Sequence, residues 1–240
     1  MQTVRTGPAL GFLAQVALLA GLGGTAGLGG AGWLVGTAYG AALCGLLTWG
    51  MHRSGARNLG PADWVTLARA VLVGGVAALT ADSFDGPAPV RLLVVLTAVA
   101  LVLDGVDGQV ARRTGTVSAL GARFDMEVDA SLLLVLSLYA AHQVGAWVLV
   151  IGLMRYVFVV ATWSLPWMQA TLPPRYWRKV VAATQGVVLV AASAGVVPVP
   201  LMVAALMVAL ALLVESFGRD VIWLWARRRP AVSLATPRSR

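Results

Sequence analysis

Residues 104–129 of the sequence read DGVDGQVARRTGTVSALGARFDMEVD. Long apolar runs flank this stretch on both sides. It contains four aspartates, and insertion scales assign a charged side chain at the bilayer centre a cost of about 2.5–3.5 kcal/mol. Four such side chains in an apolar context indicate a functional site.

The four aspartates form two pairs with helical spacing, Asp104 with Asp107 and Asp125 with Asp129. Residues three or four apart share one helix face, so a chain reversal at 114–115 brings two helix ends side by side with both pairs face to face. Oxygen ligands without histidine or cysteine favour Mg²⁺, Mn²⁺ or Ca²⁺ over zinc. Two such ions about 4 Å apart suit chemistry on a phosphate group. The spacing therefore predicts a divalent-cation site between two helices.

Small residues and an arginine lie between the two pairs. Gly108 and Ala111 leave the helix surface bare, so that a bulky ligand can lie against the backbone. Arg112, one turn after Gly108, offers a planar fork of donors for phosphate oxygens. These residues predict a phosphate-bearing ligand beside the cations.

The stretch resembles the signature of the CDP-alcohol phosphotransferase (CDP-alcohol phosphatidyltransferase) family, D-x-x-D-G-x-x-A-R-x8-G-x-x-x-D-x-x-x-D. Every fixed position of this signature is met, by Asp104, Asp107, Gly108, Ala111, Arg112, Gly121, Asp125 and Asp129. The resemblance implies a membrane enzyme that transfers a substituted phosphate from a CDP-linked donor to a hydroxyl acceptor and releases CMP. It also implies a homodimer.

The resemblance further implies a role for each matching residue. Two Mg²⁺ ions, or Mn²⁺ in their place, would be held by Asp104, Asp107 and Asp125. Asp129 would complete the metal site and act as general base on the acceptor hydroxyl. Five residues would hold the nucleotide, the last two from the first core helix: Gly108, Ala111, Arg112, Asp63 and Thr66.

The composition is that of a membrane protein. The 240 residues are 59% hydrophobic and 12% charged, with a mean hydropathy of +0.82, whereas soluble domains are roughly 25% charged. The basic residues behind the net charge of +8 are scattered between apolar runs. They are interpreted as topology and lipid-headgroup signals, and nucleic acid is not an expected partner.

The expected architecture is an all-α, polytopic membrane helical bundle of about eight spans. Residues 1–58 form a transmembrane hairpin with apolar segments at 9–22 and 31–51, residues 59–226 form a six-span catalytic core, and residues 227–240 form a basic cytoplasmic tail. The first segment also fits a signal peptide because its apolar run is short. The hairpin is favoured because the second segment continues directly into the core.

The first core helix carries Thr66 and Arg69 on one face. Arg69 either snorkels to the headgroups or, as the resemblance implies, lies near the nucleotide. Further along, Arg155 sits inside an apolar segment and requires an anionic partner. A basic cluster opens the fifth core helix, either as a positive-inside anchor or as an acceptor site. The candidate contacts for an acceptor phosphate are Arg155, Arg175, Arg178 and Lys179.

The basic residues also predict the orientation. With eight spans, Arg5, Arg53, Arg57 and the later basic clusters fall on one side, while the other side carries Asp82, Asp85, His142 and only Arg91. By the positive-inside rule the carboxylate cluster faces the cytoplasm. The protein is expected in the inner (cell) membrane.

The favoured function is phosphatidyl transfer from CDP-diacylglycerol to a small polar alcohol or its phosphate. A CDP-aminoalcohol donor with diacylglycerol as acceptor is the alternative within the family. A transporter that uses intramembrane Asp and Arg residues is the alternative from another class, but its charges would spread through the mid-bilayer, whereas these acids gather at one face. An inactive scaffold is disfavoured by the intact aspartates.

Overall fold

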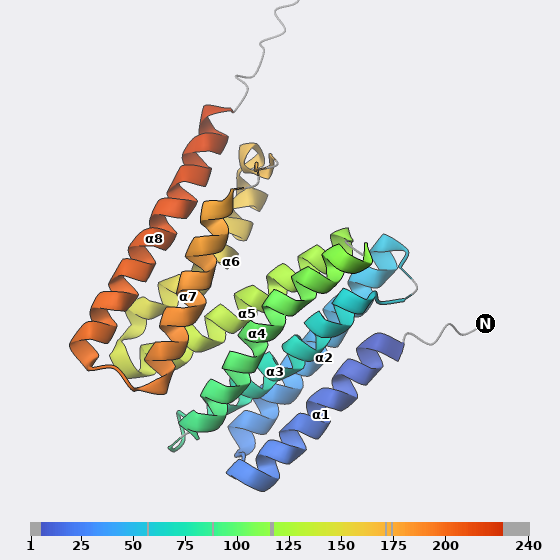
Figure 1. Ribbon diagram of the computed structural model, residues 1–240, viewed down its shortest axis with the longest axis vertical. Coiled ribbons are helices and arrows are strands. Elements are labelled where there is room, and N and C mark those ends of the chain that lie inside the picture. The colour runs from blue at the N-terminus through green and yellow to red at the C-terminus, as the bar shows by residue number, and fades with distance from the viewer. Residues whose placement is uncertain are drawn as a thin grey trace, which may run out of the picture.

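The computed structural model describes residues 6–56, 58–87, 89–115, 118–170, 172–173 and 175–227. Within these ranges the chain forms helices and no strand (Figure 1). The helices are α1 Thr6–Ala26, α2 Gly30–Ser54, α3 Pro61–Asp82, α4 Val90–Thr114, α5 Ala119–Val144, η1 Ala146–Val148, α6 Leu149–Ser164, η2 Pro166–Gln169, α7 Tyr176–Ala194 and α8 Val199–Ala226. The predicted all-α fold is confirmed.

Five helical segments of the described chain are long and apolar enough to cross a membrane: α1, α2, α3, the continuous segment Ala146–Ser164, and α8. The remaining long helices, α4, α5 and α7, carry most of the charged residues of the predicted site. At 25 and 26 residues, α4 and α5 still exceed the roughly 20 residues that span about 30 Å of hydrocarbon. The chain is therefore a polytopic bundle. Its division at residue 58, between α2 and α3, stays a prediction.

Helix α3 forms the centre of the first half of the bundle. It packs against α1, α2, α4 and α5, and most of its residues are buried. It is rich in glycine and alanine, and small residues allow helix backbones to approach closely within a membrane. At Gly74 a Cβ atom would collide with the side-chain amide of Gln15 on α1. The extra hairpin therefore packs tightly against the helix that supports the predicted site.

Helix α5 joins the two halves of the molecule. Figure 1 shows α1 to α4 gathered on one side of α5 and α6 to α8 on the other. Helix α5 packs against α3 in the first group and against α6 and α7 in the second, while α7 also packs against α4 and α8. Residues on different faces of α5 therefore reach two different sites.

The reversal between the two aspartate pairs occurs where the sequence predicts it. Gly115 ends α4 in the left-handed region, with φ of 64°, which glycine adopts without steric strain. Ser118 caps α5, because its Oγ accepts a hydrogen bond from the Gly121 N–H at 2.9 Å. Residues 116 and 117 lie outside the described chain.

At the opposite end, Asp82 ties the hairpin to the core. Its carboxylate accepts hydrogen bonds from the N–H groups of Gly29 and Gly32, at 2.6 and 2.7 Å. These groups lie at the start of α2, where the helix dipole favours a negative charge. On the same side Phe84 and His142 stack with ring centroids 4.8 Å apart. Arg5, Arg57 and the arginines after Arg227 lie outside the described residues, and the predicted orientation stays a prediction.

Candidate active site

Arg69 lies at the centre of the site, with a side chain only 1% exposed. From α3 its Nη1 donates to Asp104 Oδ1 and Asp107 Oδ2 on α4, at 2.5 and 2.8 Å. Its Nη2 donates to Asp125 Oδ1 and Asp129 Oδ1 on α5, at 2.5 and 2.7 Å. One guanidinium group therefore holds both predicted carboxylate pairs.

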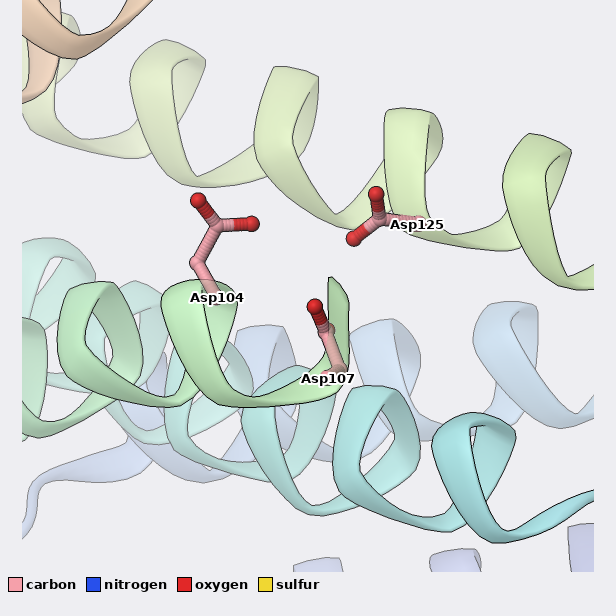
Figure 2. Close-up of side chains that lie close together, drawn as sticks. All are labelled: Asp104, Asp107 and Asp125. Atoms are coloured by element: carbon pink, nitrogen blue, oxygen red, sulfur yellow. The ribbon is translucent and has the colours of Figure 1, made fainter. Parts of the chain in front are cut away.

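The aspartates converge on a common space. Figure 2 shows Asp104 and Asp107 rising from α4 toward α5, and Asp125 pointing back toward them. One carboxylate oxygen from each of these three lies within 4.8 Å of the others. Asp107 is buried, whereas the Asp129 side chain is 47% exposed. The cluster is thus fixed at its base and accessible to a ligand.

Two expectations from the sequence need correction. The aspartates lie inside α4 and α5 and not at their ends, because both helices continue past the apolar runs. The snorkelling interpretation of Arg69 is wrong, since its guanidinium is buried among four carboxylates. An intramembrane arginine is stabilised by an acidic partner, and here α4 and α5 supply four.

The cluster fits divalent cations in charge and in ligand type. Each aspartate binds Arg69 through one oxygen, which leaves its second oxygen for another partner. Four carboxylates and one guanidinium carry a formal charge of −3, that is, −4 plus +1. Hard cations such as Mg²⁺ prefer carboxylate oxygens. The remaining negative charge and the free oxygens therefore favour cation binding.

Asp63 and Thr66, both predicted to contact the nucleotide, are buried and bonded within the protein. Asp63 Oδ2 accepts a hydrogen bond from the Gly60 N–H at 2.8 Å, which caps α3. Thr66 Oγ1 donates a hydrogen bond to Asp107 Oδ2 at 3.1 Å and so helps to orient that carboxylate. The signature glycine Gly121 packs against Asp63, and a Cβ there would collide with the carboxylate. Their contact with a nucleotide stays a prediction.

The residues predicted to hold the nucleotide from α4 form a surface that is partly covered by an arginine side chain. A Cβ atom at Gly108 would lie 3.4 Å from Arg112 Nη1, so the arginine folds back over the glycine. Arg112 is exposed, and Ala111 is half-buried beside it. This geometry agrees with a surface that a ligand can approach.

A cavity of about 680 Å³ lies beside the cluster, between α5, α6, α7 and α8. Cavities of 300–1,000 Å³ are typical of small-molecule sites. Asp129 lines this cavity as well as belonging to the cluster. The four basic residues predicted to bind the acceptor also line it: Arg155, Arg175, Arg178 and Lys179. Helix α5 thus places Asp129 where the acidic cluster and the basic cavity meet.

The anionic partner that Arg155 requires is Glu127. Arg155 Nη2 on α6 lies 2.5 Å from Glu127 Oε1 on α5. Glu127 falls between Asp125 and Asp129 in sequence, so its side chain leaves α5 on another face. The sequence alone missed this pair because it requires the packing of α5 against α6.

A buried acid on α8 faces the basic cluster of α7. Arg178 Nε lies 3.1 Å from Asp220 Oδ2, an ion pair without hydrogen-bond alignment. Arg175 Nη1 lies 3.9 Å from Asp220 Oδ1. Arg178 also donates from Nη2 to the Pro173 carbonyl at 2.5 Å. Asp220 has no predicted role, and its position in the last, apolar helix is the one signal that the sequence carries for it.

A further polar group in the cavity has an unused acceptor. Gln185 on α7 is fully buried, and its Nε2 donates to the Ala209 carbonyl at 2.8 Å. Its Oε1 is buried without a partner among the described residues, and Gln185 lines the cavity. An unsatisfied buried acceptor costs about 1–3 kcal/mol, and this oxygen is itself covered by protein atoms.

An oxygen-only acidic cluster beside a cavity with basic side chains, within a polytopic bundle, defines a membrane enzyme that acts on phosphate esters. Residues 60–215 match the CDP-alcohol phosphatidyltransferase family, and the chain belongs to this family. It is therefore an integral membrane transferase of substituted phosphate groups, which uses a CDP-alcohol donor and an alcohol acceptor. The family is metal-dependent, and the aspartate cluster could hold a metal ion. The sequence matches no curated protein and no solved structure significantly.

Proposed function

We propose that this protein transfers the phosphatidyl group of CDP-diacylglycerol to the hydroxyl of a small polar alcohol or its phosphate and releases CMP. The observation that carries the proposal is the position of Asp129, which belongs to the acidic cluster and also lines the basic cavity. A donor held at the cluster and an acceptor held in the cavity would meet at this side chain.

The basic cavity supports a polar acceptor over diacylglycerol. Four basic side chains line it, three of them arginines that are about one-third exposed and one an exposed lysine. The planar donor fork of arginine and the ammonium group of lysine favour an anionic or strongly polar ligand. Diacylglycerol offers a single hydroxyl and no charge, so a CDP-aminoalcohol donor with a diacylglycerol acceptor is the weaker alternative.

In the proposed reaction the acceptor hydroxyl oxygen attacks the phosphorus atom that carries diacylglycerol. The bond from that phosphorus to the CMP oxygen breaks, and CMP leaves. The hydroxyl proton passes to Asp129, whose Oδ1 is held by Arg69 and whose Oδ2 remains to accept it. Arg69 keeps the carboxylate oriented during this step.

The metal ions and the nucleotide are assigned to the residues at the cluster. Asp104, Asp107, Asp125 and Asp129 would hold two Mg²⁺ ions, which would neutralise the pyrophosphate and the charge that develops on the departing CMP. Arg112, whose side chain lies over Gly108, would bind the CDP phosphates. The positive-inside distribution supports an active site at the cytoplasmic face of the inner membrane, and we infer a homodimer from the family resemblance.

The test is CMP release from CDP-diacylglycerol by the purified chain, with and without Mg²⁺, across a panel of alcohols and alcohol phosphates. We expect Mg²⁺-dependent release that falls about 10²–10⁴-fold in Asp129→Asn, because a positioned general base contributes about that factor. Asp85→Asn is the matched control, since Asp85 is an exposed acid at the opposite end of the bundle. No release with any donor and acceptor, or full activity in Asp129→Asn, would contradict the proposal.

A further inference from the structure

Asp220 is a buried acid that neither the family match nor the proposed mechanism accounts for. It lies beyond residue 215, where the match ends, and its side chain is 8% exposed. Carboxylates are almost never buried without a partner. Asp220 lines the cavity, and its partners are the two arginines that open α7.

The start of α7 is an unfavourable place for positive charge. Arg175 is the N-cap of this helix, and Arg178 and Lys179 lie in its first turns. A helix N-terminus carries a partial positive charge that favours anions and disfavours cations. Three basic side chains at this end therefore repel one another and the helix dipole. Asp220 is the only acid of the described chain that forms an ion pair with any of them.

The contacts divide the three basic residues into two groups. Arg178 is engaged within the protein, through Asp220 at Nε and through the Pro173 carbonyl at Nη2. Arg175 approaches Asp220 only through Nη1, at 3.9 Å, so its other donors are not committed. Lys179 has no ion-pair partner among the described residues. Arg175 and Lys179 thus present unused donors to the cavity, while Arg178 anchors the helix end.

We propose that Asp220 is a positioning residue for the acceptor, which holds Arg178 and Arg175 so that Arg175 and Lys179 bind an anionic group on the acceptor alcohol. This inference rests on the proposed function, because it assumes that the cavity is the acceptor site. The acceptor then carries its anionic group at the α7 end of the cavity and its reacting hydroxyl at Asp129. Asp220 acts through the arginines and contacts neither the reacting atoms nor the donor.

The test compares Asp220→Asn, Asp220→Glu and the wild-type full-length chain in CMP release from CDP-diacylglycerol. The acceptor probes are glycerol 3-phosphate and inositol phosphate, each paired with its uncharged parent alcohol. Glu215→Gln is the matched control, because Glu215 is also an acid of α8 that contacts α7, through the Trp177 indole N–H at 3.0 Å, and it does not line the cavity. Melting temperatures of all variants are measured alongside.

For the phosphorylated probe that turns over, we expect Asp220→Asn to raise the acceptor KM about tenfold and to leave kcat and the donor KM within about twofold. Asp220→Glu should restore most of the loss, and Glu215→Gln should match wild type. A purely structural role would instead lower kcat, raise both KM values and lower the melting temperature together. That pattern, an unchanged acceptor KM in Asp220→Asn, or a preference for the uncharged alcohols would overturn the inference.

A separate readout covers the case in which the wild-type chain releases no CMP, which would contradict the proposed function itself. Thermal stabilisation by the phosphorylated probes is then compared between wild type and Asp220→Asn. Stabilisation of the wild-type chain that is lost in Asp220→Asn supports the role of Asp220. Equal stabilisation of both chains, or none in either, overturns it.

Discussion

Two regions of the molecule are built in the same way but with opposite charges. One is the acidic cluster between α4 and α5, and the other is the basic cavity between α5 and α8. In the cluster, a buried arginine from α3 gathers four aspartates. In the cavity, a buried aspartate from α8 gathers two arginines. In both places one charged side chain binds several side chains of the opposite charge. The proposed chemistry requires those several side chains to lie close together.

The two sites differ in how firmly the side chains are held. The contacts of Arg69 are 2.5–2.8 Å long, whereas Asp220 contacts its arginines at 3.1 and 3.9 Å, and the shorter of these two contacts lacks hydrogen-bond alignment. Short, aligned hydrogen bonds between charged groups constrain geometry more strongly than long or misaligned contacts. We infer that the metal and donor site is pre-formed and that the acceptor site retains freedom to adapt.

The largest expected effect comes from removing the arginine at the centre of the cluster. Arg69→Ala leaves four carboxylates without their shared cation, and loss of one partner of a buried pair costs about 3–5 kcal/mol. We expect a large fall in melting temperature without Mg²⁺. Mg²⁺ should raise the melting temperature of this variant more than that of wild type, because the formal charge of the cluster changes from −3 to −4.

The control for this variant is Arg53→Ala. Arg53 is exposed at the end of α2, where it stacks over Trp49 at 4.6 Å, so its removal should change the melting temperature only slightly. An equal response of wild type and Arg69→Ala to Mg²⁺ would show that Arg69 and the cations do not share the four carboxylates.

A smaller effect is expected where α3 and α5 meet behind the cluster. Gly121→Ala places a methyl group against the Asp63 carboxylate and 3.0 Å from Ser118 Oγ, and overpacking of this kind costs about 1–3 kcal/mol. The start of α5 should shift away from α3 and spread the two aspartate pairs. CMP release should fall about tenfold at subsaturating Mg²⁺ and recover in part at high Mg²⁺.

Gly45→Ala serves as the control, because Gly45 has open space around it. A Gly121→Ala enzyme with wild-type Mg²⁺ dependence would show that the contact between Gly121 and Asp63 does not affect the aspartate pairs.

The smallest effect is expected at the outer wall of the cavity. Glu127→Gln releases Arg155 from a pair whose carboxylate side chain is half-exposed, and exposed pairs contribute about 0.2–1 kcal/mol. The melting temperature should change little, and the acceptor KM should change by less than in Asp220→Asn. If Glu127→Gln changed the acceptor KM more than Asp220→Asn does, Glu127 and not Asp220 would be the more important acid for the cavity.

The acidic cluster could be predicted from sequence because its geometry is local. Asp104 and Asp107, like Asp125 and Asp129, share a helix face by spacing alone, and Gly115 marks the reversal between them. The membrane class could be predicted from the apolar composition, and the helical fold could be predicted from the long apolar runs. The pattern of apolar runs did not predict that the aspartates lie inside the helices, because polar residues can continue a helix beyond its apolar run.

The residues that hold each site together could not be predicted, since they come from helices distant in sequence. Arg69 reaches both aspartate pairs because α3 packs against α4 and against α5. Glu127 and Asp220 meet their arginines across the α5–α6 and α7–α8 contacts. Spacing within one helix carries no information about such partners.

The central claim is that the four aspartates around Arg69 hold divalent cations. Anomalous scattering from crystals of the wild-type chain soaked with Mn²⁺ and a CDP-linked donor tests it most directly. The account predicts anomalous peaks between Asp104, Asp107 and Asp125, with Arg69 still bonded to the carboxylates on the other side. Saturating Mn²⁺ that leaves this space empty, or that binds only elsewhere, would contradict it.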